Sequence, residues 1–380
     1  MTSTSNSRDA IVVVGAGIIG LNVASILADQ GLGQYVTVIA EHLPGDTSIN
    51  YTSPWAGANF SAISGNDANA LRWDRTGYQH LTRLAQQVGA ESFVQQTPST
   101  EYWDDKVSDD KMQSLSEYLN DVSPSTTARS SRTVHGVLTR MHQFQIVPET
   151  QLPSGVASGL KYTTVTINAP EHIKFLHLRL KDQHGVRFLR KKIADIKDAY
   201  LGSQTQVVFN CTGNASAHLA GVEDPKCYPT RGQIVLVKAP DVHQNVMRHG
   251  RDYVTYIIPR PFSNGNVILG GYMQKGVSTS DTFSHETESI LERTGELSSE
   301  VRNGSPEIMA VLAGLRPSRE GGARVEAVQL KVRDQDRLLV HNYGAGGTGF
   351  QAGYGMAVDA VASAKHILDR LSSRVNQAKL

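Results

Sequence analysis

The sequence has little cysteine, no excess of one charge and no long apolar run. Its two cysteines, Cys211 and Cys227, provide neither a disulfide framework nor a cluster of metal ligands, so we expect no metal site. The chain has 37 basic and 36 acidic side chains, a formal net charge of +1, which gives no sign of a nucleic-acid surface. No apolar stretch reaches the length of a membrane-spanning helix, and the polar residues 1–9 lack the apolar core of a secretory signal. We therefore expect neither a nucleic-acid nor a membrane partner.

What the sequence does contain is a glycine-rich unit near its start. An apolar run at 11–14 predicts a buried strand, and Gly-Ala-Gly-Ile-Ile-Gly follows directly at 15–20. A helical pattern at 21–29 leads to a second apolar strand at 35–40, which ends at Glu41. A strand, G-x-G-x-x-G, a helix, a second strand and an acid within about thirty residues predict a dinucleotide-binding unit.

Each part of this unit has a physical role. Gly15 lets the chain turn sharply out of the strand, Gly17 lets a pyrophosphate approach the backbone, and Gly20 lets the helix pack closely on the strand. The helix N-terminus offers unpaired N–H groups to the phosphates. Glu41 is placed to accept hydrogen bonds from a ribose diol. The unit by itself does not distinguish NAD from FAD.

The rest of the chain continues as mixed helices and strands. Residues 42–59 form a loop of small and hydroxyl residues that suits a backbone lying against a flat ring or sugar, and 91–162 is less periodic. A second glycine loop at 344–350 opens the last helix. We expect helices at 68–88, 169–181, 281–294, 306–313 and 352–371, and strands at 186–190, 206–210, 232–238, 253–259, 266–271 and 338–343.

These patterns predict an α/β protein with an α+β substrate part. A discontinuous Rossmann-like dinucleotide-binding domain would comprise 1–100, 169–225 and 305–380. An inserted, mainly antiparallel sheet would form the substrate-binding domain from 101–168 and 226–304.

Seven blocks occur in the order found in one known family: 14–21, 53–59, 210–213, 231–233, 256–259, 314–317 and 341–344. On these blocks the chain resembles the D-amino-acid oxidases of the fungal type, across nearly its whole length. The resemblance implies FAD as cofactor and hydride transfer from the substrate Cα to flavin N5. It implies oxidation of D-amino acids to imino acids and on to 2-oxo acids and ammonia, with O2 reduced to hydrogen peroxide.

The resemblance also implies which residues hold FAD. Gly15, Gly17 and Glu41 would hold the diphosphate and ribose, and a helix N-terminus at 346–351 would face the flavin and favour negative charge there. The full implied set is Gly15, Ala16, Gly17, Ile18, Ile19, Gly20, Glu41, Ser48, Gly57, Ala58, Asn59, Ile193, Thr212, Gly314, Gly346, Gly347, Gly349, Phe350 and Gln351.

For the substrate, the resemblance assigns the carboxylate to Arg316, whose planar fork pairs with both oxygens. Tyr256 would add a third bond to the carboxylate, and Tyr253 is the candidate lid residue. Gln351 and the Gly347 carbonyl would hold the amine. No general base is required, because orientation and the cofactor perform the chemistry.

Three other functions stay open from the sequence. A D-aspartate oxidase needs a further cation, and mammalian forms carry arginine where this chain has Met273, which favours neutral substrates. Arg248 and Arg251 in the preceding segment could nevertheless supply that cation. An NAD-dependent dehydrogenase and a FAD-binding scaffold without turnover are the remaining alternatives.

The end of the sequence carries a candidate address. Ala378-Lys379-Leu380 resembles the Ser-Lys-Leu peroxisomal signal and follows a polar segment. We therefore expect a peroxisomal import receptor as a partner, with the cytoplasm as the location if the signal is not read. A homodimer is also left open.

Overall fold

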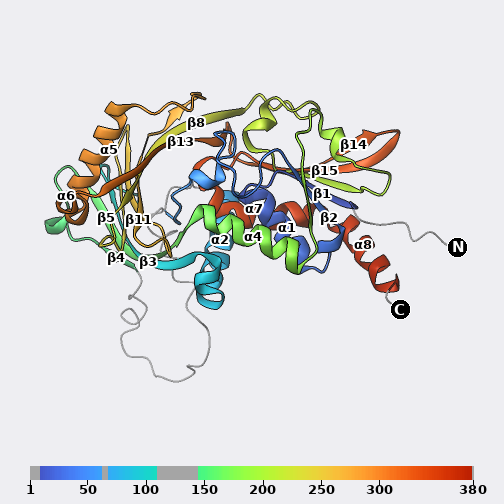
Figure 1. Cartoon of the computed structure of the whole chain (residues 1–380), viewed down its shortest axis with the longest axis horizontal. Coiled ribbons are helices and arrows are strands. Elements are labelled where there is room, and N and C mark those ends of the chain that lie inside the picture. Colours follow the sequence, from blue (N-terminus) through green and yellow to red (C-terminus); the bar gives the residue numbers. More distant parts are fainter. Residues whose placement is uncertain (1–8, 62–66, 109–143, 379–380) are drawn as a thin grey trace, which may run out of the picture.

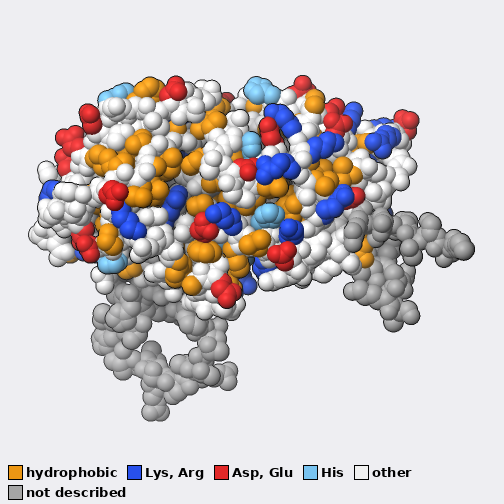
Figure 2. Space-filling model, in the orientation of Figure 1, with side chains coloured by type: hydrophobic (Ala, Val, Ile, Leu, Met, Phe, Trp, Pro, Cys, Tyr) orange, Lys and Arg blue, Asp and Glu red, His pale blue; other side chains and the backbone are white. Residues whose placement is uncertain are grey.

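The computed structural model describes residues 9–61, 67–108 and 144–378. Within them the chain forms two sheets that lie side by side along the long axis of the molecule (Figure 1). The first sheet carries the glycine-rich unit, and the second forms the other half of the molecule. On the face shown in Figure 2, basic and acidic side chains are interspersed, in keeping with the balanced composition.

The first sheet has the strand order β14-β15-β7-β1-β2-β6. Five strands run parallel and β14 is antiparallel to β15. The strands are β1 (Ile11–Val14), β2 (Val36–Ala40), β6 (Arg187–Arg190), β7 (Val207–Asn210), β14 (Arg324–Val332) and β15 (Gln335–Tyr343). The predicted strands at 11–14, 35–40, 186–190, 206–210 and 338–343 are confirmed within a few residues.

Alternate residues of a strand face opposite sides of a sheet, so each face of this sheet has its own apolar contacts. Val13 packs with the helices, whereas Val12 and Val14 pack with Ile196 and Tyr200 on the other face. Within the described residues, the helices are α1 (Ile18–Asp29), α2 (Ala68–Gln87), α4 (Ala169–Leu178), α5 (Ser284–Leu297), α6 (Ser299–Gly304), α7 (Gly349–Ser363) and α8 (Lys365–Ala378). The single helix expected at 352–371 is thus two helices that meet at Ala364.

The second sheet has the order β12-β8-β11-β10-β9-β3-β5-β4, with β13 paired to β8. Its pairs are antiparallel except β3 with β9. The strands are β3 (Val94–Trp103), β4 (Phe144–Ile146), β5 (Ser158–Ile167), β8 (Cys227–Lys238), β9 (Asn245–His249), β10 (Val254–Pro259), β11 (Asn266–Gly270), β12 (Gln274–Lys275) and β13 (Glu307–Arg319). Helices α5 and α6 cover its outer face through Ile290 and Val301.

The helix expected at 306–313 is wrong, because these residues begin strand β13. Ser305 and Pro306 suggested a helix start, but Ser305 has a left-handed backbone, with φ of 40°, and ends α6 instead. Residues 307–319 then pair with β8 over its whole length. Long-range pairing has overridden the local signal.

The expected domain division stays a prediction. The second sheet includes β13, whose residues 307–319 fall in the part expected to bind the dinucleotide, and β3, which begins at Val94. Among the described residues, the sequence does not predict strands β3, β4, β5, β9, β12, β13 and β14. All of these except β14 lie on the second sheet, where pairing partners such as β3 and β9 are distant in sequence.

No helix among the described residues is both long and apolar enough to cross a bilayer. In the same part of the chain, no three His, Cys, Asp or Glu side chains gather where they could hold a metal ion.

Candidate active site

One large cavity, of about 1160 Å³, is lined by the carboxyl ends of the first sheet and the inner face of the second. This exceeds the ~300–1,000 Å³ of an ordinary ligand pocket, so it has room for a dinucleotide and a small substrate together. Of the residues expected at the site, those lining it are Gly15, Ala16, Gly17, Ile18, Ile19, Glu41, Gly57, Ala58, Asn59, Ile193, Thr212, Tyr253, Tyr256, Gly314, Arg316, Gly346, Gly347, Gly349, Phe350 and Gln351.

The turn between β1 and α1 leaves room for a pyrophosphate. A Cβ on Gly15 would lie 2.4 Å from the carbonyl oxygen of Cys211, and Gly15 has φ of 109°, so no other residue fits there without strain. Gly17 begins the helix without a side-chain cap, so the cavity meets the helix N-terminus directly. This turn, a cradle that carries no bulky side chain of its own, fits the diphosphate of FAD.

Two expected cofactor residues do not line the cavity. Gly20 lies behind it, where a Cβ would be 1.9 Å from the carbonyl oxygen of Gly15, so its role is close helix packing. Ser48 instead supports the neighbouring loop, since its backbone oxygen accepts a hydrogen bond from Trp55 Nε1 at 3.1 Å. Glu41 does reach the cavity, and Lys192 Nζ lies 3.1 Å from its carboxylate.

The loop at 53–61 is held from the second sheet. Arg260, just after β10, donates hydrogen bonds to the carbonyl oxygens of Gly57 at 3.3 Å and Ala56 at 3.2 Å. Ala58 exchanges two backbone hydrogen bonds with Ile167 at the end of β5. The backbone expected beside the flavin is thus fixed by residues that the sequence did not single out.

The first turn of α7 faces the cavity. Gly349, where α7 begins, and Gly347, just before it, both line the cavity. Gln351 is buried here, and its Nε2 lies 3.1 Å from both carboxylate oxygens of Asp74 on α2. Its Oε1 accepts from the backbone N–H of Ser61 at 3.3 Å. Gln351 therefore also clamps α7 to α2, which the sequence did not reveal.

At the substrate end, the structure brings Arg316 and Tyr256 together. Arg316 Nη2 donates to the Tyr256 hydroxyl at 3.3 Å, and Nη1 donates to the carbonyl oxygen of Tyr272 at 3.1 Å. Gly232 on β8 makes room for the guanidinium, because a Cβ there would lie 2.1 Å from Nη1. A cation and a hydroxyl facing a partly apolar cavity form a receptor for a carboxylate.

Tyr253 lines the cavity, but its hydroxyl donates to Asp104 at 2.8 Å. Asp104 also accepts from Arg248 Nε at 2.7 Å. Arg251 is exposed and paired with Asp105. Neither Arg248 nor Arg251 lines the cavity. In the described part of the chain, these two arginines are therefore not placed to bind a substrate side chain.

The sequence missed Ser53 as a site residue. Its hydroxyl accepts the backbone N–H of Ile18 at 3.0 Å and lines the cavity beside Gly17. The hydroxyl-rich loop at 42–59 was a signal for it, although nothing local specified which hydroxyl would reach the helix.

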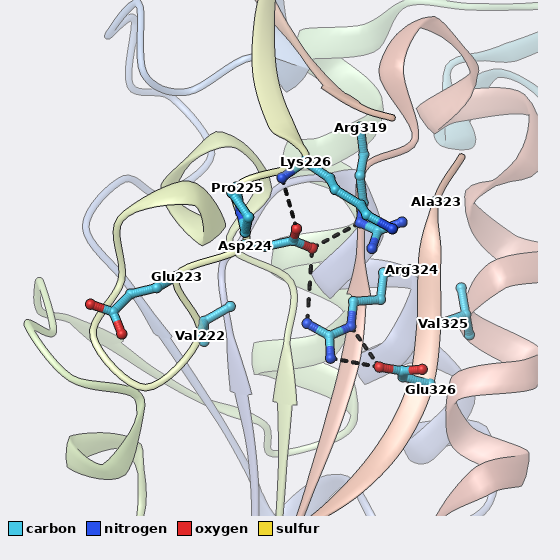
Figure 3. Close-up of a pocket in the computed structure, with 10 residues that line it drawn as sticks. All are labelled: Val222, Glu223, Asp224, Pro225, Lys226, Arg319, Ala323, Arg324, Val325 and Glu326. Carbon is cyan, nitrogen blue, oxygen red and sulfur yellow. Dashed lines mark hydrogen bonds and ion pairs between the residues drawn. The ribbon is translucent and has the colours of Figure 1, made fainter. Parts of the chain in front are cut away.

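A second, smaller pocket of about 430 Å³ lies at the seam between the two sheets (Figure 3). Asp224 is its centre: it accepts from Arg319 Nε at 2.8 Å and from the Tyr343 hydroxyl at 2.9 Å. Arg324 in turn bonds Tyr343 and Glu326. Because Arg319 is on β13 and Tyr343 is on β15, this cluster joins the second sheet to the first.

The Asp224 cluster has a consequence for acid stability. Burial alone would raise the pKa of Asp224, but the hydrogen bonds from Arg319 and Tyr343 lower it to about 2. A depressed pKa contributes stability above the unfolded value of ~3.9, and that stability is lost as the pH falls towards 2. We expect Asp224→Asn to lower the free energy of unfolding by about 2 kcal/mol at pH 7. The melting temperature of the variant should approach that of the unaltered protein as the pH falls from 5 to 2. A constant difference over that range would contradict this account.

Comparison with known proteins agrees with this geometry. Residues 10–362 match the model of the family described as FAD dependent oxidoreductase. The chain is 43% identical to a D-amino-acid oxidase of Schizosaccharomyces pombe, over 95% of this chain and 97% of the relative. It is 28% identical to a D-aspartate oxidase of Cryptococcus neoformans var. grubii, over 95% of this chain and 98% of the relative. The fold is similar to that of the glycine oxidase from Geobacillus kaustophilus, with a TM-score of 0.67 and 16% identity. The similarity covers 94% of this chain and 95% of the glycine oxidase chain. The cradle, the cavity and these matches together show that the chain belongs to the FAD-dependent oxidoreductase family.

Proposed function

We propose that this protein is a D-amino-acid oxidase that prefers neutral side chains. The observation that carries the proposal is the Arg316–Tyr256 pair, which faces the same cavity as the dinucleotide cradle. A relative that is 43% identical over nearly the whole chain is named a D-amino-acid oxidase, which supports the same reaction. A scaffold without turnover would not need a carboxylate receptor beside its cofactor.

The residues of this chain bind and orient the substrate. Arg316 and Tyr256 hold the α-carboxylate, and the cavity wall fixes the orientation in which the single hydrogen on Cα faces the cofactor. Bound in this cavity, FAD would supply the redox chemistry, namely acceptance of a hydride from Cα and reduction of O2 to hydrogen peroxide. The amine loses a proton as the imino acid forms, and water then converts the imino acid to a 2-oxo acid and ammonia. The α7 N-terminus favours negative charge at its end of the cavity.

Neutral substrates fit better than D-aspartate. Met273 lines the cavity where a second cation would be required, and Arg248 and Arg251 are engaged by Asp104 and Asp105. An uncompensated carboxylate in a largely apolar site costs several kcal/mol. An NAD-dependent dehydrogenase is not favoured, because the family is FAD-dependent.

The direct test is peroxide release from matched enantiomers. We expect D-alanine and D-methionine to be oxidised and their L-forms to give no signal above background. With the carboxylate on Arg316 and Cα–H facing the flavin, an L-form would exchange the amine and the side chain and lose the amine contacts expected at Gln351 and Gly347. Anaerobic D-alanine should bleach the yellow absorbance of the holoenzyme. Comparable peroxide release from L-alanine would rule out the proposal.

We further propose that the enzyme works in peroxisomes, where its peroxide product is contained. The proposal rests on Ala378-Lys379-Leu380, of which Lys379 and Leu380 lie outside the described residues. Helix α8 runs to Ala378, so the polar segment that precedes the tripeptide is helical. Deleting the tripeptide should move a tagged protein from peroxisomes to the cytosol; unchanged punctate fluorescence would refute the address.

A further inference from the structure

The two groups that receive the carboxylate both depend on the backbone at the end of β11. Tyr256 on β10 is the register partner of Gly270 on β11. A Cβ on Gly270 would lie 2.2 Å from Cε2 of Tyr256, and a Cβ on Gly271 would lie 2.1 Å from Cε1, so the ring rests directly on this backbone. The next carbonyl, that of Tyr272, accepts the hydrogen bond from Arg316. This short segment therefore places both the hydroxyl and the guanidinium.

Arg293 of helix α5 ties the same segment to the start of β10. Its Nη2 donates to the carbonyl oxygen of Gly271 at 3.0 Å. Its Nη1 donates to the carbonyl oxygen of Val254 at 2.9 Å and to the hydroxyl of Thr255 at 2.7 Å. A guanidinium can bond both chain segments at once because its donors form a planar fork. One side chain thus joins the strand that carries Tyr256 to the backbone on which the Tyr256 ring rests.

This side chain acts from the face of the sheet that lies away from the cavity. Neighbouring residues of β10 face opposite sides, so Ile257 packs in a cluster with Ile290 of α5, whereas Tyr256 lines the cavity. In the part of the chain that the structure describes, Arg293 is not among the residues that line the cavity. Any effect of Arg293 on the substrate must therefore pass through the residues that it holds.

The Arg293 guanidinium also contacts two tyrosine rings. Its central carbon lies 5.5 Å from the ring centroid of Tyr272 and 5.7 Å from that of Tyr253. A cation is attracted to an aromatic face at such distances. Tyr272 supplies the carbonyl that receives Arg316, and Tyr253 lines the cavity. These contacts fix the orientation of the guanidinium directly behind the carboxylate receptor.

Resting on the proposed function, we infer that Arg293 is a positioning residue for the carboxylate receptor. It holds the strand that carries Tyr256 and the segment whose Tyr272 carbonyl anchors Arg316. Hydrogen bonds weaken steeply when their distance or angle departs from the ideal. Loss of Arg293 should therefore weaken carboxylate binding, although both groups that bind the carboxylate remain.

The test measures how tightly the holoenzyme binds propionate, which is D-alanine without its amine, by isothermal titration calorimetry. We expect Arg293→Met to raise the dissociation constant of propionate and the KM for D-methionine at least about tenfold each, the effect of losing one hydrogen bond to a charged group. The FAD content should not change. The ratio of the KM values for D-alanine and D-methionine should also stay the same, because both substrates present the same carboxylate.

Two variants distinguish positioning from general damage. Arg293→Lys keeps the positive charge but lacks the planar fork, so its affinity for propionate should lie between those of the unaltered protein and Arg293→Met. Arg337→Met is the matched control, because Arg337 also donates to a backbone carbonyl, that of Ser203 at 2.8 Å, and is not among the described residues that line the cavity. Its affinity for propionate should equal that of the unaltered protein.

Thr255→Val keeps the inference testable if neither Arg293 variant folds. It removes one acceptor of Arg293 and preserves the shape of the side chain, so it should raise the dissociation constant of propionate about threefold. Unchanged propionate affinity in every folded variant, or no propionate binding by the unaltered holoenzyme, would overturn the inference. Absence of D-methionine oxidation by the unaltered holoenzyme would instead overturn the proposed function.

Discussion

Arg316→Ala should lower kcat/KM for D-methionine by roughly 30- to 4,000-fold, chiefly through KM, while the protein keeps its FAD. The variant removes the cation that receives the α-carboxylate and leaves that carboxylate in a largely apolar cavity beside Tyr256. Truncating one partner of such a charge pair costs about 2–5 kcal/mol, and each 1.4 kcal/mol is tenfold. The measurement is steady-state peroxide release together with the flavin absorbance per protein.

Arg316→Lys is the informative control. It keeps the positive charge but loses the planar fork, so it should recover only part of the lost kcat/KM. Loss of FAD from Arg316→Ala would show that the residue supports the cofactor cradle and does not act mainly on the substrate. A kcat/KM within threefold of the unaltered enzyme would remove Arg316 from the substrate site.

Gly232→Val should lower kcat/KM by about 100-fold without a matching loss of stability. A Cβ at this position would lie 2.1 Å from Nη1 of Arg316, which is the far end of a flexible side chain. The guanidinium can therefore swing aside, so the strand survives while the carboxylate receptor is misplaced. Valine also suits a strand interior. The measurement is kcat/KM for D-methionine and the melting temperature.

Two further variants separate this effect from general damage. Gly304→Val places the same side chain where a Cβ meets no atom within 4 Å, so kcat/KM should not change. In the double variant Gly232→Val/Arg316→Ala, the loss should equal that of Arg316→Ala alone, because both changes remove one interaction. Additive losses would mean that Gly232 acts by another route.

The dinucleotide-binding unit was predictable because its signals are local. Gly15, Gly17 and Gly20 stand at fixed spacing between two apolar runs, and the structure places all three at one turn. The contacts that complete the site were not predictable in this way. Arg260 reaches Gly57 across 203 residues of chain, and the Gln351–Asp74 contact spans 277.

The substrate-binding residues were less predictable from local sequence than the dinucleotide-binding unit. Nothing in the composition or periodicity around Arg316 distinguished it from a surface arginine, and the local pattern suggested a helix ending just before it. Only the resemblance to a known family indicated its role. Its position in the structure depends on strand β13 pairing with β8, a partner about eighty residues earlier in the chain, which a local pattern does not contain.

Strand β13 also limits how this molecule can open. Arg316 faces the cavity and Arg319, three residues further along the same strand, is bound to Asp224 at the seam. An extended strand is a stiff spacer, about 10 Å long over three residues. One short piece of strand therefore holds the carboxylate receptor at a nearly fixed distance from the junction of the two sheets. We expect substrate to enter by local motion of short segments beside the cavity, such as those carrying Tyr253 and Met273.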